Sequence, residues 1–177
     1  MVNSGNMESL TTFPLLGIDP GYDRVGWCIL DPSHSTILSS GCIETDKNAS
    51  IYERYTQIDT ELMKVIKKYR PTECGVENLF FQNNAKTAMK VSEARGVIFS
   101  CLFRNHVNIF EYTPMQIKAA VTSNGRATKS EIQRMIKLLT KCEKLPKLDD
   151  EVDAIAIALC HAASRGVNRR VSTLPSL

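Results

Sequence analysis

The sequence predicts an α/β domain with a mixed five-stranded sheet, three antiparallel strands followed by two parallel strands, flanked by helices. Two observations support this fold class. The first forty-odd residues contain three β-rich runs separated by short turns, and helical and strand patterns alternate from about residue 50 onward. Because parallel strands need crossover connections, the alternation indicates that the later strands run parallel.

Composition and charge are those of an ordinary globular protein. Of the 177 residues, 43% are apolar and 23% are charged, which favours a packed core over disorder. The net charge of +3 is too small to indicate a polyanionic partner by itself. Six cysteines without a C-x-x-C pair favour neither a zinc site nor a disulfide scaffold. No apolar run approaches the ~18 residues of a membrane span, so we expect a cytoplasmic protein with no membrane partner.

The length fits one domain with short extensions. Residues 1–12 are small and polar, and we expect a disordered N-terminal extension in which Met1 or Met7 is the native start. The folded domain is expected over residues 13–166, and a flexible C-terminal tail over 167–177.

The first three elements are predicted as strands of an antiparallel meander. Residues 14–19 form a short apolar run that ends in D-P-G, which is typical of a strand entering a turn. The β-rich runs at 24–31 and 36–45 are separated by P-S-H-S and supply the other two strands.

The later elements follow from their periodicity. Apolar residues recur at three- and four-residue spacing over 50–70, and Pro71 ends that helix. The remaining elements are predicted as strands at 73–78 and 107–112 and as helices at 83–104, 114–123, 129–141 and 150–165.

Two carboxylates stand at the predicted ends of strands. Asp19 ends the first strand, and Glu77 lies near the end of the strand E-C-G-V-E-N. Ligands of α/β sheets gather beyond the carboxyl ends of strands. Taken alone, Asp19 is also explained by the D-P-G turn, and Glu77 by an edge-strand position or a salt bridge. Neither residue by itself identifies a site.

A third acidic group, D-D-E-V-D from Asp149 to Asp153, leads into the last predicted helix. Asp149 suits an N-cap, and acids in a first turn are stabilised by the helix dipole, which explains Asp149 and Glu151 without any function. Asp150 and Asp153 share a helical face, but a different helix start would pair Asp149 with Asp153 instead. Either pair, combined with the two strand carboxylates, forms the oxygen ligand set that Mg²⁺ prefers.

The segment between residues 117 and 147 is basic, with eight Lys and Arg against two Glu. Its sequences T-P-M-Q and T-K-S-E match capping boxes, so Lys129 lies in the first turn of a helix. A cation there opposes the helix dipole, whereas a bound phosphate would satisfy both the helix terminus and the lysine. The alternative is a solvated helix face that serves solubility alone.

Four motifs occur in a fixed order along the chain. They are L-G-I-D-P-G at 16–21, G-V-E-N-L-F at 75–80, A-R-G at 94–96 and D-E-V-D-A-I-A-I-A at 150–158. In order and spacing they resemble those of RuvC-type Holliday junction resolvases (crossover junction endodeoxyribonucleases) of the RNase H-like superfamily. The resemblance implies an RNase H-like nuclease domain over 13–166. It implies two Mg²⁺ ions per active site, with Mn²⁺ as an alternative metal, held by the catalytic acids Asp19, Glu77, Asp150 and Asp153.

The resemblance also implies contacts with DNA and with other proteins. The family's functional lysines correspond to Lys118 and Lys129, and we expect Arg126, in the loop between them, to bind DNA as well. Phe80 corresponds to an aromatic side chain that wedges against bases at the junction, although a phenylalanine is more commonly part of a core. The implied partners are a four-way DNA junction, a second copy of the chain contacted through the helix containing Gly96, and the branch-migration proteins RuvA and RuvB.

The predicted function is therefore structure-specific endonuclease activity that resolves Holliday junctions by paired symmetric nicks, in recombination and DNA repair. The mechanism that the resemblance implies is two-metal-ion phosphodiester hydrolysis. Two other classes remain for comparison. Actin-like ATPases share G-I-D-P-G but need two such domains and about twice this length. A non-catalytic junction-binding module would keep the basic segment but would not need convergent acids.

Overall fold

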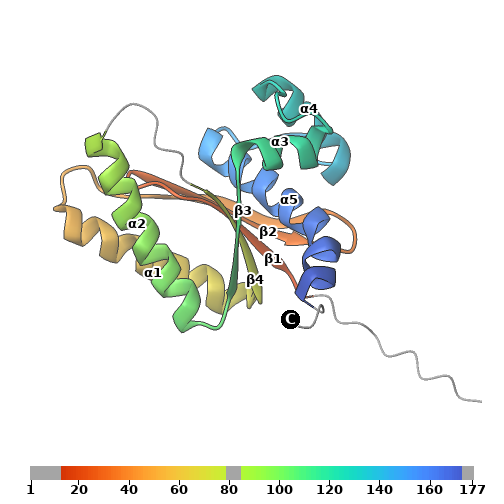
Figure 1. Cartoon of the computed structure of the whole chain (residues 1–177). Coiled ribbons are helices and arrows are strands. Elements are labelled where there is room, and N and C mark those ends of the chain that lie inside the picture. The colour runs from red at the N-terminus through yellow and green to blue at the C-terminus, as the bar shows by residue number, and fades with distance from the viewer. Residues whose placement is uncertain (1–12, 79–84, 173–177) are drawn as a thin grey trace, which may run out of the picture.

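A central sheet with helices on both faces forms the fold (Figure 1). The computed structural model describes residues 13–78 and 85–172. The strands are β1 (Leu15–Asp19), β2 (Arg24–Asp31), β3 (Thr36–Glu44), β4 (Glu73–Glu77) and β5 (Asn108–Tyr112). The helices are α1 (Ile51–Tyr69), α2 (Ala85–Arg104), α3 (Pro114–Thr122), α4 (Lys129–Thr140) and α5 (Asp149–Ser172).

The sheet has the predicted mixed topology. Its order is β3-β2-β1-β4-β5, with antiparallel pairing among β1, β2 and β3 and parallel pairing of β4 with β1 and with β5. The connections between parallel strands run through α1 and α2, which lie together on one face. This arrangement confirms the predicted fold class.

The last helix is longer than the sequence analysis predicts. We expect it over 150–165, whereas α5 continues to Ser172, into the segment expected to be a tail. The stretch contains no proline before Pro175, and Gly166 inside a helix costs only about 1 kcal/mol relative to alanine. Within the described ranges, no helix has the length and apolar character that a membrane span requires.

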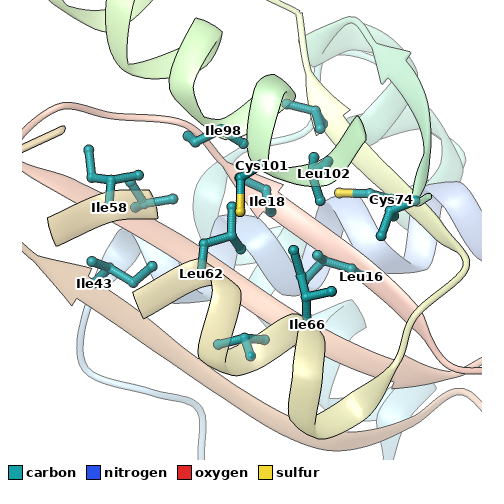
Figure 2. Packing of buried hydrophobic residues seen from close by; sticks show 14 of the residues in the cluster. Leu16, Ile18, Ile43, Ile58, Leu62, Ile66, Cys74, Ile98, Cys101 and Leu102 are labelled. Carbon is teal, nitrogen blue, oxygen red and sulfur yellow. The ribbon is translucent and has the colours of Figure 1, made fainter. Parts of the chain in front are cut away.

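Two apolar clusters hold the helices on the sheet. On one face, buried side chains of β1 pack against α1 and α2, and Figure 2 shows this cluster with Leu16, Ile18, Ile58, Leu62, Ile66, Ile98 and Leu102. Each such side chain contributes about 1.5 to 3 kcal/mol when fully buried. On the other face, α5 packs with α3 and α4 around Ile136, Ile155 and Ile157. The sheet is therefore covered on both sides.

Helix α5 lies very close to the sheet because three strand positions beneath it are glycine. A Cβ atom on Gly17 would lie 2.4 Å from the carbonyl oxygen of Ala154, and one on Gly26 would lie 1.8 Å from that of Asp150. A Cβ atom on Gly75 would lie 2.9 Å from the Cβ of His161. Glycine lets the helix backbone approach the strands directly, so the position of α5 is set by β1, β2 and β4 together.

A buried histidine, His161, fixes the other half of α5, and no sequence pattern predicted this role. His161 is fully buried, its Nδ1 lies 2.8 Å from the hydroxyl of Tyr112, and its ring stacks on Phe110 at 4.8 Å. Its Nε2 lies 3.3 Å from Glu73, whose carboxylate also pairs with Arg165 at 2.7 Å. Burial lowers the pKa of His161 to about 4, so the imidazole is neutral near pH 7.

We predict that Gly17→Ala lowers the free energy of unfolding by about 1 to 3 kcal/mol, because the added methyl group would clash with backbone atoms of α5. The matched control is Gly96→Ala, since a Cβ atom there would meet nothing within 4 Å. That control should gain up to about 1 kcal/mol from helix propensity. Chemical denaturation of both variants checks the prediction, and equal stability of the two would contradict it.

Candidate active site

Asp19 and Glu77 lie side by side at the carboxyl ends of two parallel strands. The β1–β4 register pairs Ile18 with Val76, so the next residue of each strand reaches the same edge of the sheet. Side chains alternate along a strand, and Asp19 therefore shares the α5 face with Gly17, as Glu77 does with Gly75. Both carboxylates are directed toward the side of the sheet that α5 covers.

The first turn of α5 brings further acids to the same edge. Gly26 pairs with Asp19 in the β1–β2 register and lies against the backbone of Asp150. Asp153 is on the same helical face, one turn further along. The glycine contact thus sets the register of α5 over the strand carboxylates.

Asp149 has a different environment from Asp150. Asp149 is the first residue of α5 and not its N-cap. An N-cap at Asp149 would require the helix to begin at Asp150, whereas it begins at Asp149. The amide of Val152 is bonded to the carbonyl of Leu148, which occupies the cap position. The Asp149 carboxylate is exposed and pairs with Lys129 at 2.7 Å. The packing of α5 therefore directs Asp150, and not Asp149, toward Asp19.

The electrostatics of the site are those of crowded negative charge. Burial, followed by the charges of Asp153, Glu77 and Asp150, raises the pKa of Asp19 to about 8. Burial is also the largest cause that raises the pKa of Glu77 and of Asp153. A divalent cation would relieve this repulsion, and four carboxylates are the oxygen donor set that a hard cation prefers.

A hollow of about 180 Å³ opens beside these acids, and Glu77, Asp153 and Lys118 all line it. Lys118 comes from α3, which starts at a capping box formed by Thr113 and Gln116, as predicted. Its charge lowers the pKa of Glu77 against the effect of burial. Lys118, from the segment predicted to bind DNA, therefore lies beside two of the acids, Glu77 and Asp153.

The remaining predicted residues lie at the start of α4, in the loop before it, or outside the described part of the chain. Lys129 opens α4 behind the predicted capping box of Thr128 and Glu131. Arg126 is exposed in the loop before α4, where its backbone amide bonds to Asn124. Phe80 lies outside the described residues.

Two arginines lie near the acids, although the sequence alone did not indicate them as site residues. The Nε of Arg24, at the start of β2, lies 3.0 Å from the carboxylate of Asp150. Arg95, on α2, donates to the backbone oxygen of Glu77. Among the described residues, no group of three or more ligating side chains converges at metal-binding distance. Asp150 and Asp149 each have a basic partner, which is Arg24 for Asp150 and Lys129 for Asp149.

Comparison with known proteins identifies the family. A family model described as crossover junction endodeoxyribonuclease RuvC matches residues 15–161. The chain belongs to the RuvC family. RuvC of Petrotoga mobilis is 47% identical over 153 residues, which cover 85% of this chain and 94% of that protein. RuvC of Thermotoga maritima is 41% identical over 157 residues, which cover 88% of this chain and 94% of that protein.

A solved RuvC structure shares the architecture. Thermus thermophilus RuvC, solved in complex with a Holliday junction substrate, matches with a TM-score of 0.80 and 28% sequence identity. The match covers 88% of this chain and 96% of that chain. The RNase H-like fold expected from the sequence motifs is therefore confirmed for this RuvC family member.

We predict that Asp19→Asn stabilises the protein in metal-free buffer, and more so as pH rises. Because the folded-state pKa of Asp19 is raised, wild-type stability should fall as pH rises from about 4 to about 8, where the buried carboxyl loses its proton. At pH 9 the variant should gain about 1 to 3 kcal/mol over wild type. Asp59→Asn, which alters an ion pair with Arg104 on the far face, is the control.

The measurement is thermal melting in chelator at pH 5 and pH 9, repeated with added Mg²⁺. Wild type should gain stability from the ion and Asp19→Asn should gain less, because a ligand that binds the folded state shifts the unfolding equilibrium. A variant less stable than wild type at pH 9 would show that the acids do not repel one another there.

Proposed function

We propose that this RuvC family member is a crossover junction endodeoxyribonuclease that resolves Holliday junctions. The observation that carries this function is the convergence of acids from β1, β4 and α5 beside a basic segment, in a chain of this family. The predicted alternative, a non-catalytic junction-binding module, gives no reason for carboxylates to be crowded at this edge.

In this proposal, four acids of the site would hold a pair of Mg²⁺ ions, namely Asp19, Glu77, Asp150 and Asp153. When bound, the ions would supply an activated water and stabilise the leaving oxygen of the phosphodiester. Asp19 is central among the acids, since the other three all raise its pKa, and it would hold the metal together with them. Mn²⁺, with its preference for oxygen ligands, is suited to the same residues.

The basic residues would orient the DNA strand that is cut. Lys118 shares the hollow with Glu77 and Asp153, so a phosphate bound there would contact the lysine and approach the acids. Lys129 stands at the start of α4, where unpaired backbone amides favour an anion, and its present partner Asp149 is an exposed carboxylate that a phosphate could replace. Arg126, in the exposed loop before α4, would contact the DNA backbone.

Paired nicks require two active sites, and we propose that α2 supplies the contact with a second copy. Met89 and Phe103 are 64% and 79% exposed on this helix, and the surface above Gly96 is open. Large exposed apolar side chains beside a glycine suit close helix packing. The family resemblance adds RuvA and RuvB as partners, and we propose the cytoplasm as the place where the protein acts.

We predict that Asp153→Asn abolishes junction nicking but retains junction binding, because the amide keeps the shape of the side chain and loses the anionic ligand. Rates should fall by at least 100-fold at saturating protein. The matched control is Asp149→Asn, one turn earlier on the same helix, which should nick at a rate close to wild type. Gel-based binding and cleavage of a synthetic four-way junction test both, and full nicking by Asp153→Asn would remove it from the site.

Removal of the Lys118 or Lys129 charge should weaken the salt dependence of junction binding. Each lost phosphate contact should reduce the slope of log affinity against log salt by about one unit, measured in Ca²⁺ or chelator. Lys67→Ala, on exposed α1 surface, is the control and should leave the slope unchanged. Unchanged slopes for Lys118→Ala and Lys129→Ala would favour a solvated basic face.

The dimer is tested by Phe103→Glu, which places a charge on the proposed α2 contact. Analytical ultracentrifugation should show a dimer for wild type and a monomer for the variant, with an unchanged melting temperature at low protein concentration. Dimeric Phe103→Glu protein would exclude this surface.

A further inference from the structure

Arg95 is a buried charged residue on the face of the sheet that the active site does not occupy. It lies on α2 and is 8% exposed, among the apolar residues Ala94, Ile98 and Leu102. Its guanidinium donates to the backbone oxygen of Glu77 and to the carboxylate of Glu111, and lies 4.5 Å from the ring of Phe99. It thus contacts the last residue of β4 and the residue before the last of β5.

The contact lies where the pairing between β1 and β4 ends. The β1–β4 register ends at Val76, so Glu77 is paired only on its β5 side, with Tyr112. Glu111, the other partner of Arg95, pairs with Val76 in the same ladder. Arg95 therefore holds the backbone of Glu77 in place of a ladder contact and ties it to the next strand.

Burying a guanidinium is costly unless its hydrogen bonds are satisfied, and an apolar side chain at this helix position would pack at a lower cost. The cost is offset by two charge-assisted hydrogen bonds, one of which acts on the residue that carries a candidate ligand. The planar fork of arginine can bond two acceptors at fixed angles, which lysine cannot do.

We propose that Arg95 is a positioning residue that fixes the backbone of Glu77, so that the Glu77 carboxylate is held toward Asp19 and Asp153. This inference rests on the proposed function, because it assigns Glu77 to the metal-binding acids. Arg95 acts from behind the sheet and touches neither the hollow nor the DNA-binding segment.

The test compares Arg95→Met and Arg95→Lys with Arg104→Lys, a control on the same helix whose arginine pairs with Asp59 on the surface. Mn²⁺ binding without DNA, measured by titration calorimetry, is the first readout, and single-turnover nicking of a four-way junction is the second. Arg95→Met should weaken Mn²⁺ binding and slow nicking by about 10- to 100-fold each, with junction affinity within about threefold of wild type. Arg95→Lys should give a smaller loss in both readouts, since it keeps the charge and loses the fork.

Glu111→Gln is a second variant for the case that the Arg95 variants do not fold. Glu111 is half-exposed, and the change keeps Arg95 in place but weakens its bond to the side chain at position 111. It should weaken Mn²⁺ binding severalfold at an almost unchanged melting temperature. If the variants melt lower but bind Mn²⁺ and nick as wild type does, the positioning role is overturned. If the wild-type protein neither binds Mn²⁺ nor nicks the junction, the proposed function and this inference are both overturned. If the wild-type protein does both and the variants match it, only this inference is overturned.

Discussion

The close approach of α5 to the sheet is the constraint on which the rest of the structure depends. Gly17, Gly26 and Gly75 remove the side chains that would keep the helix at the usual distance, and at Gly17 and Gly26 the strand backbone lies directly against the helix backbone. This contact brings Asp150 and Asp153 over the ends of β1 and β4. A displacement of about 1 Å at these glycines would separate the acids that the proposed chemistry needs together.

The same constraint creates an energetic conflict. Carboxylates that are partly buried and close together raise one another's pKa, and Asp19 shows the largest effect among them. Basic side chains at the edge of the acidic cluster partly offset this repulsion. Lys118 and Arg95 both lower the pKa of Glu77, while Arg24 and Lys129 pair with acids of the first turn of α5. Such crowding of like charges is typical of sites where function opposes stability.

Two buried polar contacts keep this arrangement rigid from opposite sides of the sheet. On the α5 side, His161 and Arg165 anchor the helix to Glu73 at the beginning of β4. On the α2 side, Arg95 anchors the end of β4 at Glu77. The short strand that carries one catalytic candidate is therefore held at both ends by residues that are distant in the sequence, and the apolar clusters alone would not specify its position so narrowly.

The sequence by itself determined the order of the elements, the mixed sheet, the capping boxes of α3 and α4, and the candidate acids Asp19, Glu77 and Asp153, because periodicity, turn chemistry and motif spacing are local properties. It left Asp149 and Asp150 as alternatives, and it gave no sign of the partners of Arg24, Arg95 or His161. Only the tertiary structure shows the different environments of Asp149 and Asp150 and the partners of these residues. The register of α5 depends on its contact with Gly26, and a buried ionic partner lies far along the chain, so both follow from packing between elements and not from any local pattern.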